Sequence, residues 1–523
     1  MRRDRQSASS QPDLDRTVGL AGAVTIGVGT MIGAGIFVFP GIAAGRAGPA
    51  ASLSFAIGAI IALLVALPTA ELATAMPKSG GGYYFISRSL GALPGALVGI
   101  GVGFGLVFAS AFYLVGFGEY AISVLMEAGI VESMPATVDS GTVAILLGIA
   151  AGVGLTVTSI LGTENTETLQ NSIVGVLLAI IAVFLSVSGL ELLGVYGETT
   201  RATGFAPEGY APVLTTAALV FTSYLGFAQI ATVAEDIVEP RRNLPLSMIG
   251  SVVLVGVLYV ITLLIAGSTF VPETIGAMGE TAIVEVARVY LGPIGAVSIL
   301  VAGLLATVSS ANASILSASR ALYALSADGL VPSQAARVSR TYGTPHFALS
   351  FVGSTTVLLV ASGRTEVLAE VASFLHLLLY GLTCVSLLKL RHESPDWYTP
   401  SFRCPGYPFV PVLGALASFG LVYYMQPLSQ LLGTAIGLIA LGWYFLYTDE
   451  LSLKGRSNDC SDTDSRRSNR GPGAGDRVRN ARGVPRTVTR RAGRYRRNPR
   501  PDEFRAGASP VRGRGTADPR YGR

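Results

Sequence analysis

Long apolar runs separated by short polar connections dominate the first 448 residues of the chain. A helix needs about 20 apolar residues to cross the hydrocarbon core of a bilayer. The chain has twelve runs of this kind, bounded by charged residues, proline and glycine. We therefore predict an all-α membrane protein with twelve transmembrane helices. The predicted limits are 17–45, 50–76, 94–126, 141–161, 168–190, 211–236, 245–270, 292–323, 345–362, 366–388, 408–425 and 428–448.

The distribution of positive charge gives an orientation to these helices. When the N-terminus is placed in the cytoplasm, the connections on that side contain fourteen lysines and arginines, and those on the other side contain four. Short loops rich in Lys and Arg stay in the cytoplasm. The pattern therefore predicts a multi-pass protein of the cytoplasmic membrane with both termini in the cytoplasm.

The two ends of the chain differ in composition from the apolar body. Residues 1–16 form a short polar segment, 17–448 the membrane domain, and 449–523 a tail that holds twenty of the 38 lysines and arginines. The tail has too few aliphatic residues to offset the entropy of ordering, so we expect it to be disordered. Each basic residue near an anionic lipid surface contributes about 1 kcal/mol of binding. The tail therefore either binds anionic lipids or is a solvated extension, and without interleaved aromatics no nucleic acid partner is expected.

Composition also limits the chemistry that the protein can perform. Only 14% of the residues are charged, and three cysteines and three histidines are scattered along the chain without metal or redox spacing. No cluster of catalytic residues lies within the predicted spans, so we expect neither an enzyme nor a cofactor. His376, inside the tenth span, is either a proton relay or a packed, hydrogen-bonded side chain.

The first span contains the stretch GVGTMIGAGIF, Gly27 to Phe37, which has four glycines in eleven residues. Glycine costs about 1 kcal/mol relative to alanine in a helix interior. A dinucleotide loop is excluded because no strand precedes the stretch. Two readings are left open: close helix packing through a small-xxx-small pair, or a helix break that exposes backbone groups to a cavity.

The sixth span favours the break, because its stretch LVFTSYLGFAQIATVAED is interrupted at a corresponding place by hydroxyl residues and Gly226. Spans one and six would each open a repeat of five helices. Discontinuous helices at matching positions are typical of inverted-repeat secondary transporters, which bind substrate near the bilayer midplane.

Four motifs in order resemble the amino acid-polyamine-organocation permeases: GTMIGAGIF, AELATAMPKSGGGYYFISRSLG, GFAQIATVAEDIVEPRRNLP and SSANASILSASRALYALSADGLVP. The resemblance covers about residues 15–450. It implies the LeuT-type fold, with a 5+5 inverted repeat followed by two C-terminal helices. It also implies a secondary transporter that moves amino acids by alternating access.

The resemblance also suggests a substrate site at the two breaks. Amide groups of the first break are similar to those that receive a substrate carboxylate, and carbonyls of the second to those that receive the amino group. Three aromatic side chains (Tyr113, Tyr224 and Phe227) would shape the pocket, unless they serve only in helix packing. The full set of candidates is Ile32, Gly33, Ala34, Gly35, Phe221, Ser223, Tyr224, Phe227 and Tyr113.

The broken segments themselves, Gly27–Phe37 and Phe221–Gly226, contain no Asp, Glu, Lys or Arg. A charged side chain of a substrate would need a partner charge in a dry site, so a neutral amino acid is the expected substrate. Glu119 in the third span is the exception. It is either a functional intramembrane carboxylate or a solvated residue near the helix end.

The coupling ion has two candidate readings. Some relatives carry a lysine in the fifth span, but here the matching position is Leu177, which argues against lysine-based proton coupling. A Na⁺ site at the family fold's second sodium position would use the carbonyls of Gly29 and Ile32 with the hydroxyls of Ser309 and Ser310, unless the two serines serve only in packing.

Three further hypotheses stay open: an exchanger that needs no ion, a carrier of polyamines or other organic cations, and a membrane sensor that signals through its tail.

Three carboxylates lie at the predicted cytoplasmic ends of their helices: Glu71, Glu235 and Asp236. We expect them to be inner-gate or loop-anchoring groups paired with basic residues, or else exposed ion pairs of little energetic weight. The expected partners are Arg88, Arg241 and Arg242.

Overall fold

The computed structural model describes the chain from residue 18 to residue 468 with short gaps. The described ranges are 18–78, 80–129, 139–161, 166–195, 204–207, 209–339 and 343–468, and the side chains of Ala34, 166–171 and 448–468 are outside the description. The segment 1–16 and the tail beyond 468 therefore lie outside the described residues, and their predicted roles stay predictions.

Helices account for nearly all of the described structure. In the first half of the chain they are α1 (Leu20–Phe37), α2 (Phe39–Ala47), η1 (Gly48–Ala50), α3 (Ala51–Ala75), α4 (Gly81–Leu90), α5 (Ala92–Glu127), α6 (Ser140–Leu161) and α7 (Thr166–Leu192). In the second half they are α8 (Ala211–Val220), η2 (Phe221–Tyr224), α9 (Gly226–Thr232), α10 (Pro240–Thr269), α11 (Pro272–Ala277), η3 (Gly279–Thr281), α12 (Ala282–Ala327), η4 (Ser333–Ala336), α13 (His346–Val360), α14 (Thr365–Glu393), α15 (Phe409–Val422) and α16 (Pro427–Ser468).

The all-α prediction is confirmed for the described residues, where the only β pairing is an isolated bridge between Val18 and Ile237. Each of the twelve predicted spans coincides with one helix or with consecutive helices. Within the described ranges, nine helical stretches are long and apolar enough to cross a membrane, and three more apolar helices are shorter. The count of twelve crossings stays a prediction.

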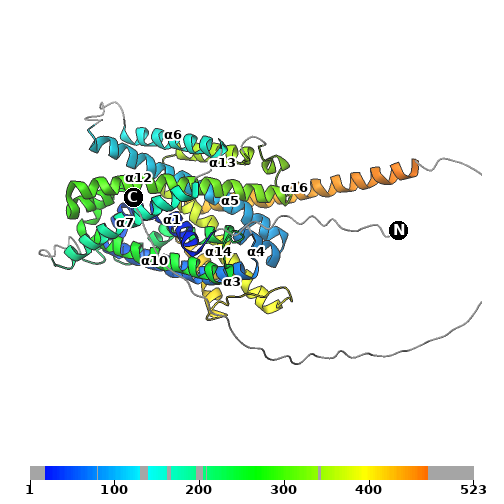
Figure 1. Ribbon diagram of the computed structural model, residues 1–523, viewed down its shortest axis with the longest axis horizontal. Coiled ribbons are helices and arrows are strands. Elements are labelled where there is room, and N and C mark those ends of the chain that lie inside the picture. The colour runs from blue at the N-terminus through cyan, green and yellow to red at the C-terminus, as the bar shows by residue number, and fades with distance from the viewer. Residues whose placement is uncertain are drawn as a thin grey trace, which may run out of the picture. The chain divides into compact units, whose positions relative to one another are not determined.

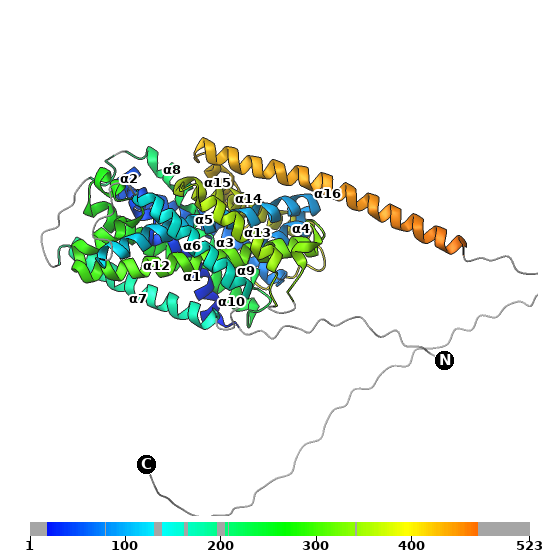
Figure 2. The same cartoon turned by 90° about the horizontal axis from the view of Figure 1, so that it is seen from above.

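The helices pack in pairs within the bundle. α3 packs on α10, α5 on α12 and α6 on α13, and the last pair lies side by side at one edge of Figure 1. The discontinuous helix α1 is enclosed by α9, α10 and α12, and both views place it inside the bundle (Figures 1 and 2). Each residue of α1 from Gly27 to Gly33 is buried.

Small residues allow the close approach of helices that membrane packing requires. A Cβ on Gly118 of α5 would lie 1.9 Å from the carbonyl oxygen of Ala144 in α6, and one on Gly303 of α12 would lie 2.2 Å from the Tyr120 ring. Larger residues at either position would force the helices apart. In α12, Gly292 has φ +68° and separates a short first segment from the apolar remainder, at the position where the eighth span was predicted to begin.

The chain divides into two units, Met1–Asn458 and Asp459–Arg523. The first contains the whole helical bundle. The second is described only as the end of α16, which ends at Ser468, beyond the predicted limit at residue 448.

Candidate functional site

The first break lies in α1 at Gly33, where the backbone leaves the helical conformation (φ −44°, ψ −120°). Gly33 also faces α12 at very short range: a Cβ there would lie 2.0 Å from Ser310 Oγ and 2.6 Å from Ser310 Cβ. The residue must therefore be glycine for the two segments to meet. The sequence prediction of a break in the first span is confirmed.

The second break lies between α8 and α9, where the four residues Phe221–Tyr224 form the 3₁₀ helix η2. A 3₁₀ stretch inside a longer helix disturbs the α-helical ladder and is typical of hinges and strained sites. Gly226 then allows α9 to touch α1, because a Cβ at this position would lie 2.5 Å from the carbonyl oxygen of Gly27. The predicted interruption of the sixth span is also confirmed.

The two breaks meet around Gly35. A Cβ on Gly35 would lie 2.0 Å from the Tyr259 hydroxyl of α10 and 2.8 Å from Ser223 Cβ. The Tyr259 hydroxyl donates to the carbonyl of Met31, next to the first break, and lies 3.3 Å from the carbonyl oxygen of Ser223 in the second. One buried tyrosine thus bridges the backbone of both interrupted helices.

Other hydroxyl groups anchor the second break to the rest of the bundle. Thr222 donates to the carbonyl of Ala369 in α14 (2.7 Å) and lies 2.8 Å from the Ser373 hydroxyl. Since the Thr222 hydrogen goes to that carbonyl, Ser373 must be the donor in their contact. The Tyr380 hydroxyl donates to the carbonyl of Leu225 (3.4 Å). Unsatisfied backbone groups are costly in hydrocarbon, and these contacts satisfy groups near the break.

The predicted pocket aromatics are all buried but point to different places. The Tyr224 ring fits beside Gly58 of α3, and its hydroxyl donates to the Phe55 carbonyl (2.8 Å). Phe227 packs against Tyr380 with ring centroids 5.0 Å apart. Tyr224 and Phe227 are therefore engaged by packing in this conformation, and a direct substrate contact stays a prediction for both.

Tyr113 of α5 is also buried, and its ring lies 5.4 Å from that of Phe112. Ile32 and Phe221 are fully buried. The side chain of Ala34 lies outside the described residues.

Ser223 differs from its neighbours, because its hydroxyl is buried without any hydrogen-bond partner among the described residues. A buried hydroxyl without a partner costs free energy. It lies beside Gly35, where both breaks meet, which makes it a candidate to bind a molecule between the breaks.

The residues of the predicted ion site also come together in part. Ser310 Oγ of α12 lies 3.5 Å from the carbonyl oxygen of Gly29 in α1. Ile32, Ser309 and Ser310 are all buried. In the described part of the chain, no group of three or more His, Cys, Asp or Glu could hold a metal ion.

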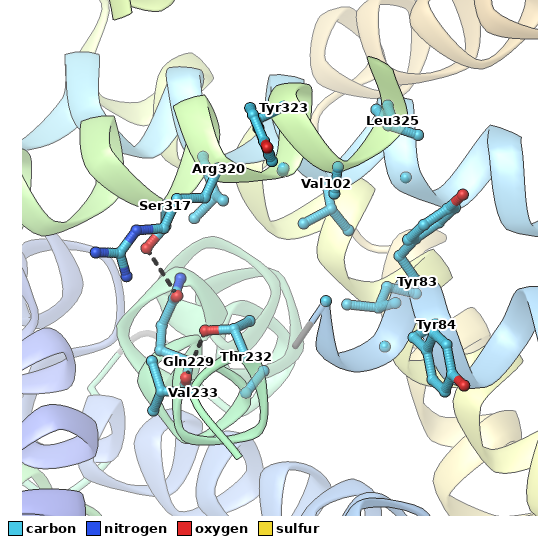
Figure 3. Close-up of a pocket in the computed structure, with 18 of the residues that line it drawn as sticks. Tyr83, Tyr84, Val102, Gln229, Thr232, Val233, Ser317, Arg320, Tyr323 and Leu325 are labelled. Atoms are coloured by element: carbon cyan, nitrogen blue, oxygen red, sulfur yellow. Dashed lines mark hydrogen bonds between the residues drawn. The ribbon is translucent and has the colours of Figure 1, made fainter. Parts of the chain in front are cut away.

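A cavity of about 550 Å³ extends from the second break toward one end of the bundle. Its lining comes from α4, α5, α9, α12 and α14. Leu225 and His376 line it deep inside, where both are buried, whereas Arg320 and Asp328 line it where they are exposed. Gln229 of α9 and Ser317 of α12 point toward each other across the cavity and are 2.9 Å apart (Figure 3). His376 contacts the carbonyl of Ala372 (2.8 Å), in line with the packed, hydrogen-bonded alternative.

Polar contacts surround the exposed end of this cavity. The Tyr83 hydroxyl of α4 donates to Asp328 (2.5 Å) at the end of α12. Burial, reinforced by this hydrogen bond, raises the pKa of the Tyr83 hydroxyl well above its usual value, so the hydroxyl keeps its proton and stays a donor. Glu235 lies 3.5 Å from Lys78, and Asp236 lines the cavity itself. The structure therefore places two of the three predicted gate carboxylates at this end.

Glu71 has a different setting. Its carboxylate is fully buried and accepts two bonds from Arg391 of α14 (2.8 and 2.5 Å). The expectation that its partner would be Arg88, Arg241 or Arg242 was therefore wrong. It failed because Arg391 follows Glu71 by 320 positions, and only the packing of α14 against α3 brings them together.

Glu71 also receives hydrogen bonds from the connection between α14 and α15. Tyr398 donates its hydroxyl (2.9 Å) and Cys404 its backbone N–H (2.6 Å). Burial, followed by the nearby Glu71 carboxylate, raises the pKa of the Cys404 thiol to about 12. Of the two predicted roles for Glu71, this geometry corresponds to loop anchoring.

At the opposite end of the bundle lies a charged network that sequence reasoning missed. Arg46 at the end of α2 forms an ion pair with Glu366 at the start of α14 (2.5 Å), and Gln426 donates to the same carboxylate (3.0 Å). The Gln426 N–H donates to Glu370, which is almost completely buried. The network joins α2, the part of the first span beyond the break, to α14.

Tyr259 was also missed. The available signal was a lone tyrosine in the apolar run SVVLVGVLYVITLLIAG. A tyrosine in a lipid-facing run usually lies near the interface, so a central one indicates a buried partner for its hydroxyl.

The sequence was also compared with known proteins. The family model described as "Amino acid permease" matches residues 22–443. The branched-chain amino acid permease BcaP of Bacillus subtilis (strain 168) is 28% identical over 449 residues, which are 84% of this chain and 95% of that protein. The methylthioribose transporter of the same organism is 28% identical over 458 residues, 85% of this chain and 96% of that protein. Its serine/threonine exchanger SteT is 24% identical over 446 residues, 83% of this chain and 97% of that protein.

Proposed function

The chain belongs to the amino acid permease family, and we propose that it carries neutral amino acids across the cytoplasmic membrane by alternating access. The observation that carries the proposal is the meeting of two interrupted helices at Gly35, Ser223 and Tyr259, next to a cavity that opens at one end of the bundle. Backbone groups at helix interruptions are the usual binding groups for the charged ends of an amino acid.

The polarity of the breaks supports a neutral substrate. Gly27–Phe37 and Phe221–Gly226 contain no charged residue. The charged residues that line the cavity, Asp236, Arg320 and Asp328, lie away from the breaks. A substrate side chain bound between the breaks would therefore meet apolar and hydroxyl groups. The relatives include proteins named for branched-chain amino acids and for serine and threonine, which are neutral.

The packing of the helices supports a 5+5 inverted repeat with twelve crossings. Helices at equal positions in the two predicted repeats pack on each other: α3 on α10, α5 on α12, and α6 on α13. The fifth helix of each repeat packs on the third helix of the other, α7 on α12 and α14 on α5. An approximate two-fold relation between the halves would produce this pattern.

The two ends of the bundle support alternating access. The end with Asp328 has the open cavity, whereas the Arg46–Glu366 pair joins α2 to α14 at the other. We propose that this conformation faces the cytoplasm, in line with the charge distribution of the loops. The outward-facing conformation would break the Arg46–Glu366 pair and close the cavity around Asp236 and Asp328.

For the driving force, we propose Na⁺ bound by Gly29, Ile32, Ser309 and Ser310. The short distance between Ser310 Oγ and the carbonyl oxygen of Gly29 supports this arrangement, because hydroxyl and carbonyl oxygens suit a hard cation. The site touches Gly33, so an ion there would stabilise the first break directly.

Uptake into proteoliposomes tests the substrate. The purified protein is offered labelled branched-chain amino acids, serine, threonine, glutamate, arginine and a polyamine, each with and without unlabelled amino acid inside. We expect accumulation or exchange of neutral amino acids. Uptake that depends wholly on internal amino acid would identify an exchanger, and transport of only charged amino acids or polyamines would refute the neutral-substrate proposal.

Imposed gradients test the ion. We expect an inward Na⁺ gradient to increase the initial rate, and Ser310→Ala to remove that increase while substrate-driven exchange persists. Ser298→Ala on the same helix is the matched control, because its hydroxyl is exposed and bonds only to the Ile294 carbonyl in its own helix. A wild-type rate that is independent of Na⁺ would exclude the site.

A further inference from the structure

A second cavity lies outside the transport path, on the outer surface of the bundle. It has a volume of about 400 Å³ and is lined by parts of α5, α12, η4, α13 and α16. Phe347, Phe351 and Ile439 line it and are about half or more exposed, so the cavity is a groove open to the surroundings of the bundle. Its lining is Ile100, Gly103, Phe104, Val107, Ala318, Leu322, Leu325, Val331, Pro332, Gln334, Ala335, Phe347, Phe351, Val352, Ile439, Ala440 and Trp443.

The groove has almost no polar surface to offer. Gln334 is the one lining residue with a polar side chain apart from Trp443. The indole N–H of Trp443 already donates to the carbonyl of Leu330 (3.0 Å). A water molecule needs two to four polar partners to occupy a cavity stably, so this groove is suited to an apolar molecule.

The position of the groove in the bundle indicates that its apolar ligand is a lipid. Four of the five walls belong to helices predicted to span the membrane, and the fifth, η4, covers the groove at the end where the chain leaves α12. The surrounding medium along these helices is lipid hydrocarbon. The short η4 wall makes the groove a bounded slot, unlike the open helix surfaces beside it.

One lining residue leaves room for an occupant. A Cβ placed on Gly103 of α5 would meet no atom within 4 Å. The position is thus free of protein contacts on its side-chain face, in contrast to Gly99 one turn earlier, which touches Tyr83 and Leu325.

The end of the groove next to η4 carries positive charge. Arg337 directly follows η4 and is exposed, and this end belongs to the side of the membrane where the loops are rich in Lys and Arg. A lipid whose chain lies in the groove would place its headgroup near this guanidinium. Basic residues near the membrane surface favour anionic headgroups.

From these observations we propose that the groove between α5, α12, η4, α13 and α16 binds an acyl chain of an anionic phospholipid, with Arg337 next to the headgroup. The site is separate from the substrate path and does not depend on the identity of the substrate. α5 and α12 form the wall between the two cavities, and Leu325 lines both.

Tryptophan fluorescence provides a direct test, because the chain has only two tryptophans. The Trp397→Phe variant leaves Trp443, in the groove, as the single reporter. The protein is reconstituted in bilayers with an increasing mole fraction of phosphatidylglycerol carrying brominated chains, which quench fluorescence on contact. We expect quenching that saturates at a low mole fraction, and brominated phosphatidylcholine to need about a fivefold higher one.

Two glycine variants separate the groove from the general lipid boundary. Gly103→Leu fills the groove, and we expect it to remove the saturating component while leaving the linear, boundary component. Gly154→Leu is the matched control, since Gly154 of α6 is exposed and also has nothing within 4 Å of a Cβ. It should leave the wild-type curve unchanged.

The headgroup part of the proposal is tested with Arg337→Gln, which should make the two brominated lipids equivalent while keeping saturation. Purely linear quenching in the wild-type reporter, or a saturating curve that survives Gly103→Leu, would overturn the site. Equal saturation by both lipids in the unmodified reporter would overturn the anionic preference. Both measurements are independent of transport, so failure of the proposed function would leave them interpretable.

Discussion

The two interrupted helices break in opposite ways. The break in α1 is made by absent side chains: at Gly33 and Gly35, atoms of Ser310 and Tyr259 occupy the space that a Cβ would need. The break between α8 and α9 is made by present side chains, because Thr222 and Tyr224 reach out to α14 and α3. Neighbouring side chains fill the space beside the α1 break, whereas the side chains of the α8–α9 break form hydrogen bonds to neighbouring helices.

This difference assigns distinct tasks to the two breaks. At Gly33 and Gly35, neighbouring hydroxyl groups lie directly against the α1 backbone, and both residues are buried. The α8–α9 break is fixed at both ends and keeps a single free hydroxyl, that of Ser223. We therefore expect substitutions in α1 to act through lost space, and those in η2 through lost hydrogen bonds.

The largest expected effect comes from filling the α1 break. In Gly33→Leu the new side chain would overlap Ser310, whose Oγ lies 2.0 Å from the position of a Cβ. We expect substrate uptake into proteoliposomes to be lost completely, whereas membrane insertion and folding, followed by fluorescence-detected size-exclusion chromatography, persist.

A space-restoring pair controls for this result. Gly33→Ala should strongly reduce substrate-driven exchange, which does not need the ion, and adding Ser310→Gly should restore part of that exchange, because the second change removes both atoms that the new methyl group would meet. Uptake in Gly33→Leu at the wild-type level would contradict a binding site at this break.

The second-largest effect on transport is expected from removing the hydroxyl group that links the two breaks. Tyr259→Phe removes the hydroxyl that contacts the carbonyls of Met31 and Ser223. A buried polar group left without its partner costs about 1–3 kcal/mol, so we expect a lower melting temperature and a weaker apparent affinity for substrate. Thermal unfolding and uptake kinetics measure the two effects.

Tyr290→Phe is the matched control, since the Tyr290 hydroxyl lies 3.1 Å from Thr269 in a partly buried position away from the breaks. A similar loss of affinity in both variants would show that Tyr259 has no special role in joining the breaks.

The same contrast explains what the sequence could predict. Glycine spacing and hydroxyl residues within apolar runs are local signals, and they located both breaks and the helices around them. The contacts that complete the site come from distant segments: Tyr259 reaches Met31 across 228 positions, and Arg391 reaches Glu71 across 320. The hydrophobic periodicity of the sequence cannot predict such long-range contacts, because each contact depends on how the helices pack.

Side-chain direction was also beyond local signals. Tyr224 is predicted to line the substrate pocket, and in this conformation its ring packs against α3, where Gly58 has no side chain. The local sequence around Tyr224 is the same whether its ring lines the pocket or packs against α3. Only the shape of the neighbouring helix decides between these two directions.

A smaller effect is expected at the anchor of the second break. Thr222→Val keeps the shape of the side chain but removes the bonds to the Ala369 carbonyl and to Ser373. We expect a loss of about 1 kcal/mol in stability and a change in maximal transport rate that exceeds the change in affinity, because η2 would be less firmly held to α14. Thr215→Val, whose hydroxyl bonds locally to the Pro212 carbonyl, should change neither kinetic constant.

The smallest structural effect should come from Ser223, and it separates binding from folding most cleanly. Its hydroxyl has no partner among the described residues, so Ser223→Ala should change stability by less than about 0.5 kcal/mol, as for a residue whose contacts are not lost. If the hydroxyl instead binds substrate between the breaks, apparent affinity should fall about tenfold, which corresponds to about 1.4 kcal/mol of binding free energy. Melting curves and substrate-concentration series on the same preparation measure both quantities. A variant that loses stability but keeps its affinity would place Ser223 with the anchoring residues of η2 and remove it from the site.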